Sequence, residues 1–317
     1  MSFDPALFNP ESISKETAEF NQLVHDAISQ LPPTYTLPPQ QLRDDREAGK
    51  GLWPVERSDE MSDREITALG RTVPVRVFVP EQVDGVYLHI HGGGFMLGRA
   101  HHSDISNVAI GKACNLAIVS VDYRLAPENP YPAGADDCES AAVWLIENMK
   151  REFGTEKILI GGESAGGNLA AVTLLRMRDR HGFTGFSGAN LIYGVFDLTS
   201  SPSSRSWGEE KKYVLTTRLM DWFHENYVSE GDASRDDPEM SPLYHRLHDM
   251  PPALFTVGTL DPLLDDSLFM HARWTAAGNK GNLAIYPGGI HAFNAFPIQL
   301  AQEANDRAMV FLRYCLM

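Results

Sequence analysis

Residues 158–178 read ILIGGESAGGNLAAVTLLRMR, and this stretch decides the fold. A short apolar run is followed by GESAG at residues 162–166, and a stretch with helical character begins at Ala165. A G-x-S-x-G sequence between a strand and a helix is typical of a nucleophile elbow, a sharp turn from which the hydroxyl of the central Ser164 projects. The residues two positions either side of that serine must be small because the turn is crowded, which accounts for both glycines.

Short apolar runs alternate with helical stretches on both sides of this motif. The runs expected to form strands lie at residues 71–80, 86–90, 116–121, 158–160, 191–193, 253–257 and 283–286. Helices are expected at residues 104–113, 135–149, 165–178, 266–277 and 300–314. Alternation of this kind predicts an α/β fold with a mostly parallel sheet, in which the reactive loops follow the carboxyl ends of the strands.

Two segments fall outside the alternation. Residues 1–55 contain short helical stretches that are interrupted by pairs of prolines. Residues 199–231 contain an amphipathic stretch and lie between two expected strands. We predict that residues 1–55 (N-terminal cap helices) and 199–231 (a cap insertion) form a helical cap over the strand ends. Residues 56–198 and 232–317 then form the two parts of the catalytic core.

The residues that activate Ser164 can be selected by their order along the chain. A serine hydroxyl is a weak nucleophile that needs a base, and in elbow-type hydrolases the order is serine, acid, histidine. His291 follows an expected strand and a Pro-Gly-Gly turn, so it lies on a loop at a strand end. Asp261 comes just past the expected strand at 253–257. We therefore predict Ser164 as nucleophile, His291 as general base and Asp261 as the acid that orients it.

A glycine run offers donors for the negative oxygen that forms when a serine attacks a carbonyl. HGGGF at residues 91–95 follows an expected strand, and consecutive glycines leave backbone N–H groups open to a substrate oxygen. Ala165, the residue after the nucleophile, is expected to donate a further N–H. His91 precedes the serine in the chain and is interpreted as a brace for this loop. His101 and His102 follow shortly after, and two interpretations stay open for them: a surface role or a place at the mouth of the pocket.

The composition excludes several other classes of protein. The chain has 317 residues, with 27 Lys and Arg against 42 Asp and Glu, which gives a formal net charge of −15. So acidic a chain is poorly suited to binding nucleic acid or an anionic membrane surface, and no apolar run is long enough to span a bilayer. The N-terminus has none of the features of a signal peptide, and the three cysteines form no disulfide framework. We therefore expect a cytoplasmic protein.

No metal site and no cofactor are expected. Asp265 and Asp266 open an expected helix, where carboxylates favour the positive end of the helix dipole. His245 and His248 have ligand-like spacing, but no further ligand type stands beside them. The glycine-rich turn around Ser164 lacks the Lys-Ser/Thr ending of a phosphate-binding loop.

Taken together, the motifs resemble the hormone-sensitive-lipase-like branch of the α/β-hydrolases, which includes bacterial carboxylesterases. The resemblance rests on HGGGF, DYRLAPE, YPA, GESAGG, DPLLDDS and HAF, which begin at residues 91, 122, 131, 162, 261 and 291. It implies a mixed sheet of eight strands flanked by helices, and a helical cap with an insertion after the sixth strand. It also implies a triad of Ser164, Asp261 and His291 with oxyanion-hole donors at Gly93, Gly94 and Ala165. Glu163 stands where relatives commonly carry Asp or Thr, and its role stays open.

The expected activity is hydrolysis of esters with short to medium acyl chains through an acyl-enzyme. Tyr193, Leu215 and Trp222, from the cap and the strand ends, are the candidates for lining the substrate pocket. The resemblance also suggests a homodimer. One alternative is an amide- or carbamate-directed hydrolase that uses the same residues. The other is a non-catalytic receptor of the same fold, which is disfavoured because such receptors lose the histidine that stands here at 291.

Overall fold

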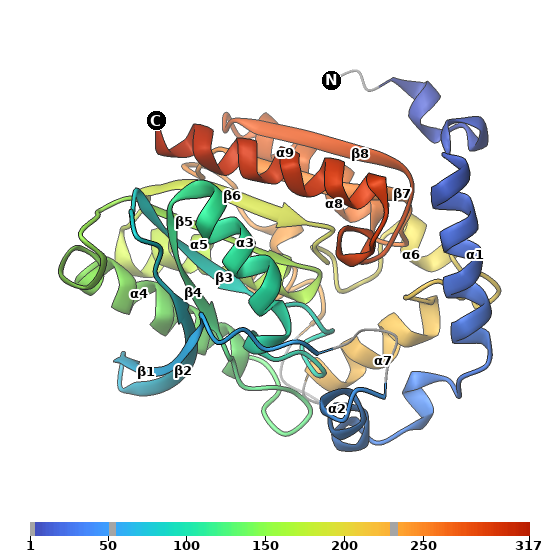
Figure 1. The fold of residues 1–317 in the computed structure, drawn as a ribbon, viewed down its shortest axis with the longest axis horizontal. Coiled ribbons are helices and arrows are strands. Elements are labelled where there is room, and N and C mark those ends of the chain that lie inside the picture. The colour runs from blue at the N-terminus through green and yellow to red at the C-terminus, as the bar shows by residue number, and fades with distance from the viewer. Residues whose placement is uncertain (1–3, 51–54, 229–233) are drawn as a thin grey trace.

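The fold is built around one sheet of eight strands. A computed structural model describes residues 4–50, 55–228 and 234–317 (Figure 1). The strands are β1 Ser62–Ala68, β2 Arg71–Phe78, β3 Gly85–Ile90, β4 Leu116–Val121, β5 Ile158–Glu163, β6 Phe186–Ile192, β7 Ala253–Leu260 and β8 Gly281–Ile290. Their order across the sheet is β1-β2-β4-β3-β5-β6-β7-β8. Strand β2 runs antiparallel to β1 and β4 and the other neighbours are parallel, so the predicted mostly parallel eight-stranded sheet is confirmed.

Helices cover both faces of the sheet (Figure 1). Helices α3 Asp104–Cys114 and α9 Gln299–Leu316 pack on one face, and α4 Ala133–Phe153, α5 Ala165–His181 and α8 Leu264–Ala276 pack on the other. Because both faces are covered, the central strands are apolar throughout. In β4, for example, Ile118 belongs to the core beside α3 and α9, whereas Val119 belongs to the core beside α4 and α5.

Several strands differ from the sequence-based expectation. Strand β6 begins at Phe186 and not at residue 191, because Ser187, Gly188 and Asn190 interrupt its apolar run, and β7 continues past residue 257 to Leu260. The edge strand β1 is missed because only Ile66 among its seven residues is buried, so it has no alternation of apolar and polar residues. Strand β8 does not end before the Pro-Gly-Gly sequence, as predicted, but continues through it to Ile290. A register shift against β7 between Gly258 and Leu260 accommodates this sequence, and the strand then ends directly before His291.

The segments predicted as a cap lie at the edge of the sheet toward which the parallel strands point (Figure 1). They contain α1 Lys15–Ser29, α2 Pro39–Glu47, α6 Pro202–Ser206 and α7 Thr217–Tyr227. Helix α1 is fastened to β8 by Asn21, whose side-chain amide donates to the carbonyl oxygen of Gly288 at 2.8 Å. The guanidinium of Arg218 in α7 stacks over the ring of Tyr35, which joins the two segments. Residues 51–54 and 229–233, including the boundary predicted at 231, lie outside the described residues.

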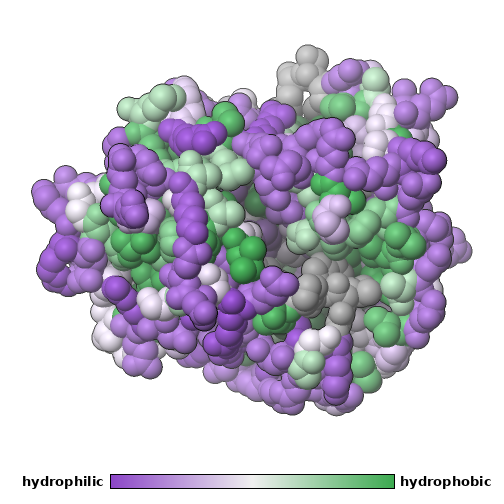
Figure 2. Space-filling model, in the orientation of Figure 1, coloured by the Kyte–Doolittle hydropathy of each residue, from purple (hydrophilic) through white to green (hydrophobic). Residues whose placement is uncertain are grey.

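Hydrophilic residues cover most of the face seen in Figure 2, as the net charge of −15 leads one to expect. Apolar residues form patches between them, including one on the side where α1 runs past α6. Within the three described ranges, no helix is both long enough and apolar enough to cross a membrane.

Candidate active site

Ser164 occupies a strained turn between β5 and α5. Its backbone dihedrals are φ 56° and ψ −119°, a combination that residues with side chains rarely adopt. The turn packs directly on the end of β3, because a Cβ added to Gly162 or Gly166 would lie 2.2 Å or 2.0 Å from the carbonyl oxygen of Ile90. A side chain at either position would push the turn away from β3, which is the physical reason for both glycines.

Three side chains from separate strand ends form a continuous chain of hydrogen bonds. Nε2 of His291 lies 3.0 Å from Oγ of Ser164, and Nδ1 lies 2.9 Å from Oδ2 of Asp261. A carboxylate only accepts hydrogen bonds, so Nδ1 carries the proton and the lone pair of Nε2 faces the serine hydroxyl. The Asp261 side chain is fully buried, and its Oδ1 accepts from the N–H of Leu263 at 2.8 Å. Nε2 of His291 can therefore take the hydroxyl proton while the serine oxygen attacks an electrophile.

The glycine run lies against this turn. Gly93 and Gly94 have φ values of 113° and 60°, in the left-handed region that favours glycine. In the part of the chain that the structure describes, no protein group accepts a hydrogen bond from the N–H of either glycine. Ala165 is the first residue of α5, where N–H groups have no acceptor within the helix. Among the described residues, none of the three predicted donors therefore has a protein acceptor for its N–H group. The glycine run approaches the serine through Gly92, where an added Cβ would lie 3.5 Å from the Cβ of Ser164.

His91 supports the glycine run from the protein side. Its ring stacks on Tyr123 with centroids 4.1 Å apart, and its Nδ1 donates to the carbonyl oxygen of Gly92 at 2.8 Å. Burial holds the pKa of His91 well below its usual range, so the imidazole is neutral. This surrounding matches the bracing role expected for His91.

Phe223 of α7, in the segment predicted as a cap insertion, covers Gly94 of the glycine run. A Cβ added to Gly94 would lie 2.4 Å from the Phe223 ring, so the ring rests directly on this glycine. Trp222, the predicted candidate, lies beside Phe223 with ring centroids 5.3 Å apart. The sequence signal for Phe223 was weak, because it is one of several aromatic residues in an amphipathic stretch.

The other two pocket candidates lie deeper in the protein. Leu215 is buried in the core cluster that also contains Phe223. The ring of Tyr193 packs against the imidazole of His291 with centroids 4.7 Å apart, and its hydroxyl donates to Asn294. Tyr193 is therefore placed to support the imidazole.

The N-terminal cap is tied to the segment that follows the glycine run. Arg43 of α2 donates through Nε to the carbonyl oxygen of Met96 at 2.7 Å. The carboxylate of Glu47, at the end of α2, lies 2.9 Å from Nε2 of His101 and 2.8 Å from Nε2 of His102. These contacts join residues more than fifty positions apart, so no local sequence pattern indicates them.

Glu47, His101 and His102 also have their ligand atoms within 4.8 Å of one another, a spacing that suits a metal ion. The hydrogen bonds around the two rings oppose that use. Nδ1 of His101 accepts from Arg57 at 3.3 Å, and Nδ1 of His102 accepts from the N–H of Arg99 at 3.2 Å. Both donors can only donate, so each ring carries its proton on Nε2, where a metal would need a lone pair. The three residues therefore form a hydrogen-bonded clasp between α2 and the core.

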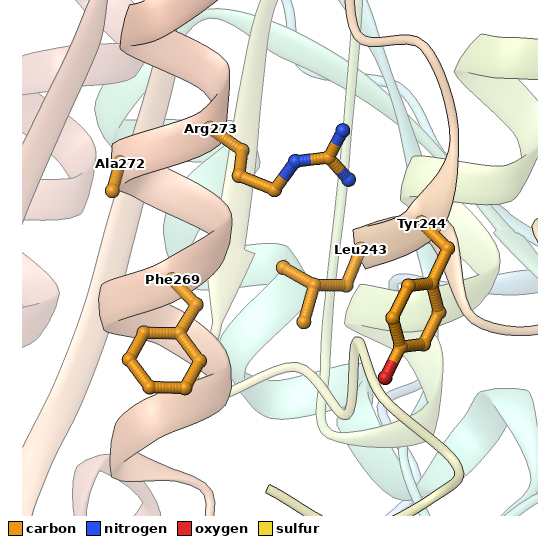
Figure 3. Close-up of a pocket in the computed structure, with 5 residues that line it drawn as sticks. All are labelled: Leu243, Tyr244, Phe269, Ala272 and Arg273. Atoms are coloured by element: carbon orange, nitrogen blue, oxygen red, sulfur yellow. The ribbon is translucent and has the colours of Figure 1, made fainter. Parts of the chain in front are cut away.

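A separate cavity of about 510 Å³ opens between α8 and the segment before β7 (Figure 3). Phe269, Ala272 and Arg273 line it from α8, and Leu243 and Tyr244 face them. Its lining is apolar and includes none of the residues around Ser164.

Comparisons with known proteins agree with this geometry. A family model described as the alpha/beta hydrolase fold matches residues 87–295. The chain belongs to the α/β-hydrolase family. Carboxylic ester hydrolase LipN of Mycobacterium tuberculosis is 33% identical over 259 residues, which cover 79% of this chain and 69% of that protein. An ethyl acetate hydrolase of Pseudomonas putida is 28% identical over 308 residues, or 93% of this chain and 96% of that one.

A solved structure identifies the branch of this α/β-hydrolase. A hormone-sensitive lipase from a metagenome library has a TM-score of 0.83 and 27% sequence identity, and the match covers 95% of this chain and 98% of that one. The predicted membership of the hormone-sensitive-lipase-like carboxylesterases is thereby confirmed.

Proposed function

We propose that this α/β-hydrolase cleaves carboxylic esters, with Ser164 as nucleophile, His291 as general base and Asp261 as the residue that orients the imidazole. The hydrogen-bond chain from Ser164 through His291 to Asp261, beside unpaired glycine amides, is the observation that carries the proposal. Ester hydrolysis is also the activity named for the relatives from M. tuberculosis and P. putida.

The reaction proceeds in two halves. Ser164 Oγ attacks the ester carbonyl while Nε2 of His291 takes the hydroxyl proton, and the carbonyl oxygen becomes an oxyanion. The N–H groups of Gly93, Gly94 and Ala165 stabilise that charge, a contribution of about 3–4 kcal/mol per donor in serine hydrolases. The imidazolium then protonates the leaving alcohol, and the acyl group stays on Ser164. A water molecule, deprotonated by His291, attacks the acyl-enzyme and releases the acid.

The preferred substrates are esters with short to medium acyl chains. This preference is supported by Phe223, which closes the space above Gly94, and by relatives named for ethyl acetate hydrolysis and as acetyl esterases. The cap formed by the N-terminal helices and the insertion then meets the acyl and alcohol groups. A cytoplasmic location and a homodimer stay predictions from the sequence.

An amide- or carbamate-directed hydrolase remains the second candidate, because the same residues would serve it. Parallel assays on a matched butyrate ester and anilide separate the two, and faster turnover of the anilide would favour the second. The mechanism itself is tested with a fluorophosphonate probe followed by peptide mass mapping. We expect a single adduct on Ser164, and an active esterase that carries no adduct there would overturn the mechanism.

A further inference from the structure

A second imidazole–carboxylate pair joins the two strands that carry the candidate site. His89 lies near the end of β3, two residues before the HGGGF motif, and Glu163 is the last residue of β5, directly before Ser164. Nε2 of His89 is 3.2 Å and 3.1 Å from the two carboxylate oxygens of Glu163. The His89 side chain is 1% exposed and that of Glu163 is 23% exposed. The proposed reaction uses neither group.

The hydrogen bonds around His89 fix its orientation. A carboxylate only accepts, so Nε2 carries a proton and donates it to Glu163. Nδ1 lies 2.8 Å from Oγ of Ser120 in β4 and 3.2 Å from the amide nitrogen of Asn107 in α3, which can only donate. The ring is therefore held from behind by two other elements, with its Nε2–H directed at Glu163. This is the arrangement of a fixed donor, and it does not suit a group that relays protons.

The pair crosses the boundary between the two parts of the site. The ladder between β3 and β5 ends where Ile90 pairs with Gly162, and beyond it the chains become the glycine run and the serine turn. Their backbones touch there, because a Cβ added to Gly92 would lie 2.8 Å from the carbonyl oxygen of Glu163. The bond from His89 to Glu163 continues the link between the strands by one residue past the ladder.

We propose that His89 and Glu163 are positioning residues that hold the oxyanion-donating glycines at a fixed separation from Ser164. The inference rests on the proposed function and gives Glu163 a role that the sequence left open. Misplacement of a reacting group by about 1 Å can cost about 100-fold in rate. Glu163 directly precedes Ser164, and His89 directly precedes Ile90 at the end of the ladder. A hydrogen bond between these two side chains is therefore placed to prevent such a shift. Neither residue touches the substrate in this scheme.

The test compares Glu163→Gln with Glu163→Ala on a short-chain nitrophenyl ester. The carbonyl oxygen of glutamine still accepts from His89, so we expect kcat of Glu163→Gln to stay within about threefold of wild type. Glu163→Ala removes the acceptor, and its kcat should fall by about 10- to 100-fold with little change in KM. Its affinity for butylboronic acid, which resembles the tetrahedral state, should fall by the same factor as kcat/KM. A double variant His89→Leu/Glu163→Ala should be no slower than the slower single variant, because the two residues act through one bond.

A matched control is His271→Leu, since His271 is also a buried imidazole but bonds the carbonyl oxygen of Gly281 at the β8 edge. It should lose stability and keep its kcat and its boronic acid affinity. Ser120→Ala, which loosens His89 from behind, is a second variant for the case that Glu163→Ala does not fold. Its kcat should fall by about fivefold, more than the change allowed for Glu163→Gln. Wild-type kcat and boronic acid affinity in folded Glu163→Ala, or in Ser120→Ala where Glu163→Ala does not fold, would overturn the positioning role. An equal loss in Glu163→Gln and Glu163→Ala would overturn it as well. A wild-type protein that does not bind butylboronic acid would instead overturn the proposed function.

Discussion

The ring of Phe223 rests on the Cα atom of Gly94, close enough that a Cβ on this glycine would lie 2.4 Å from it. Phe223 therefore closes the space directly above Gly94, one of the three proposed oxyanion donors. Any acyl chain that enters from this side has to pass the ring. The contact links the 199–231 insertion to the chemistry of the core.

Phe223→Ala should shift the preference toward longer acyl chains. Removal of the ring opens space for about two further methylenes, each of which contributes about 0.8 kcal/mol when buried. The ratio of kcat/KM for octanoate over butyrate should therefore rise about tenfold. A series of nitrophenyl esters measures this ratio. Trp222→Ala, beside it in α7, serves as the control with a smaller change. An unchanged ratio in Phe223→Ala would contradict the placement of the acyl chain under this ring.

Ser164→Ala should reduce kcat by about 10⁶-fold, the size of the loss seen when the nucleophile of a serine hydrolase is removed. The residual activity of this variant is expected to come from substrate binding and from the oxyanion donors alone. Hydrolysis of a nitrophenyl ester by the purified variant measures kcat, and thermal unfolding checks that the variant is folded. Retained activity would show that another nucleophile acts.

Asp261→Asn should lower kcat by about 10⁴-fold, because an amide in place of the carboxylate favours the wrong tautomer of His291. Asp265→Asn is the matched control, since Asp265 accepts a hydrogen bond from the N–H of Ser203 at 2.8 Å and has no bond to His291. We expect its kcat to stay near that of wild type. The opposite ranking of the two variants would move the acid of the triad to Asp265.

The clasp at Glu47 should make stability depend on pH through His102. Burial, followed by the nearby guanidinium of Arg46, lowers the pKa of His102 to about 4. In the unfolded chain its pKa is about 6.5, so between these values the unfolded state binds a proton that the folded state refuses. The free energy of unfolding therefore falls as the pH drops from about 6.5 to about 4, and below both pKa values this contribution is constant.

His102→Gln should flatten that dependence, because glutamine keeps a donor for Glu47 and does not titrate. Urea unfolding at several pH values between 7 and 4 measures the slope. The exposed His248 provides the control, and His248→Gln is expected to follow the wild-type curve. Parallel curves for wild type and His102→Gln would remove His102 as the source of the effect.

Most of the sheet and the Ser164, Asp261 and His291 positions could be predicted because their signals are local. The buried strands are continuous apolar runs, and the two glycines of G-x-S-x-G are required because one turn is crowded. His291 and Asp261 could be selected from chain order and from their places after strands. Strand β1 could not be predicted, because an exposed edge strand has no apolar alternation.

Contacts between distant parts of the chain had no such signal. Phe223 meets Gly94 and Glu47 meets His101 only after the cap has docked. The partner of Glu163 is 74 positions away, so the role of its acidic side chain stayed open in the sequence analysis. Sequence reasoning therefore named a candidate triad and the bracing His91, and it missed the contacts made by Phe223, Glu47 and Glu163.

The hydrogen bond from Asn21 to the carbonyl of Gly288 has a consequence for biosynthesis. It spans 267 positions, so helix α1 is synthesised long before β8 and finds its partner only when β8 has been made. Throughout translation, the side of α1 that carries Val24, which is buried in the finished protein, is without its docking surface. A nascent chain therefore keeps this side of α1 exposed until β8 has been made, and a variant that lacks β8 should release α1 from the core as well.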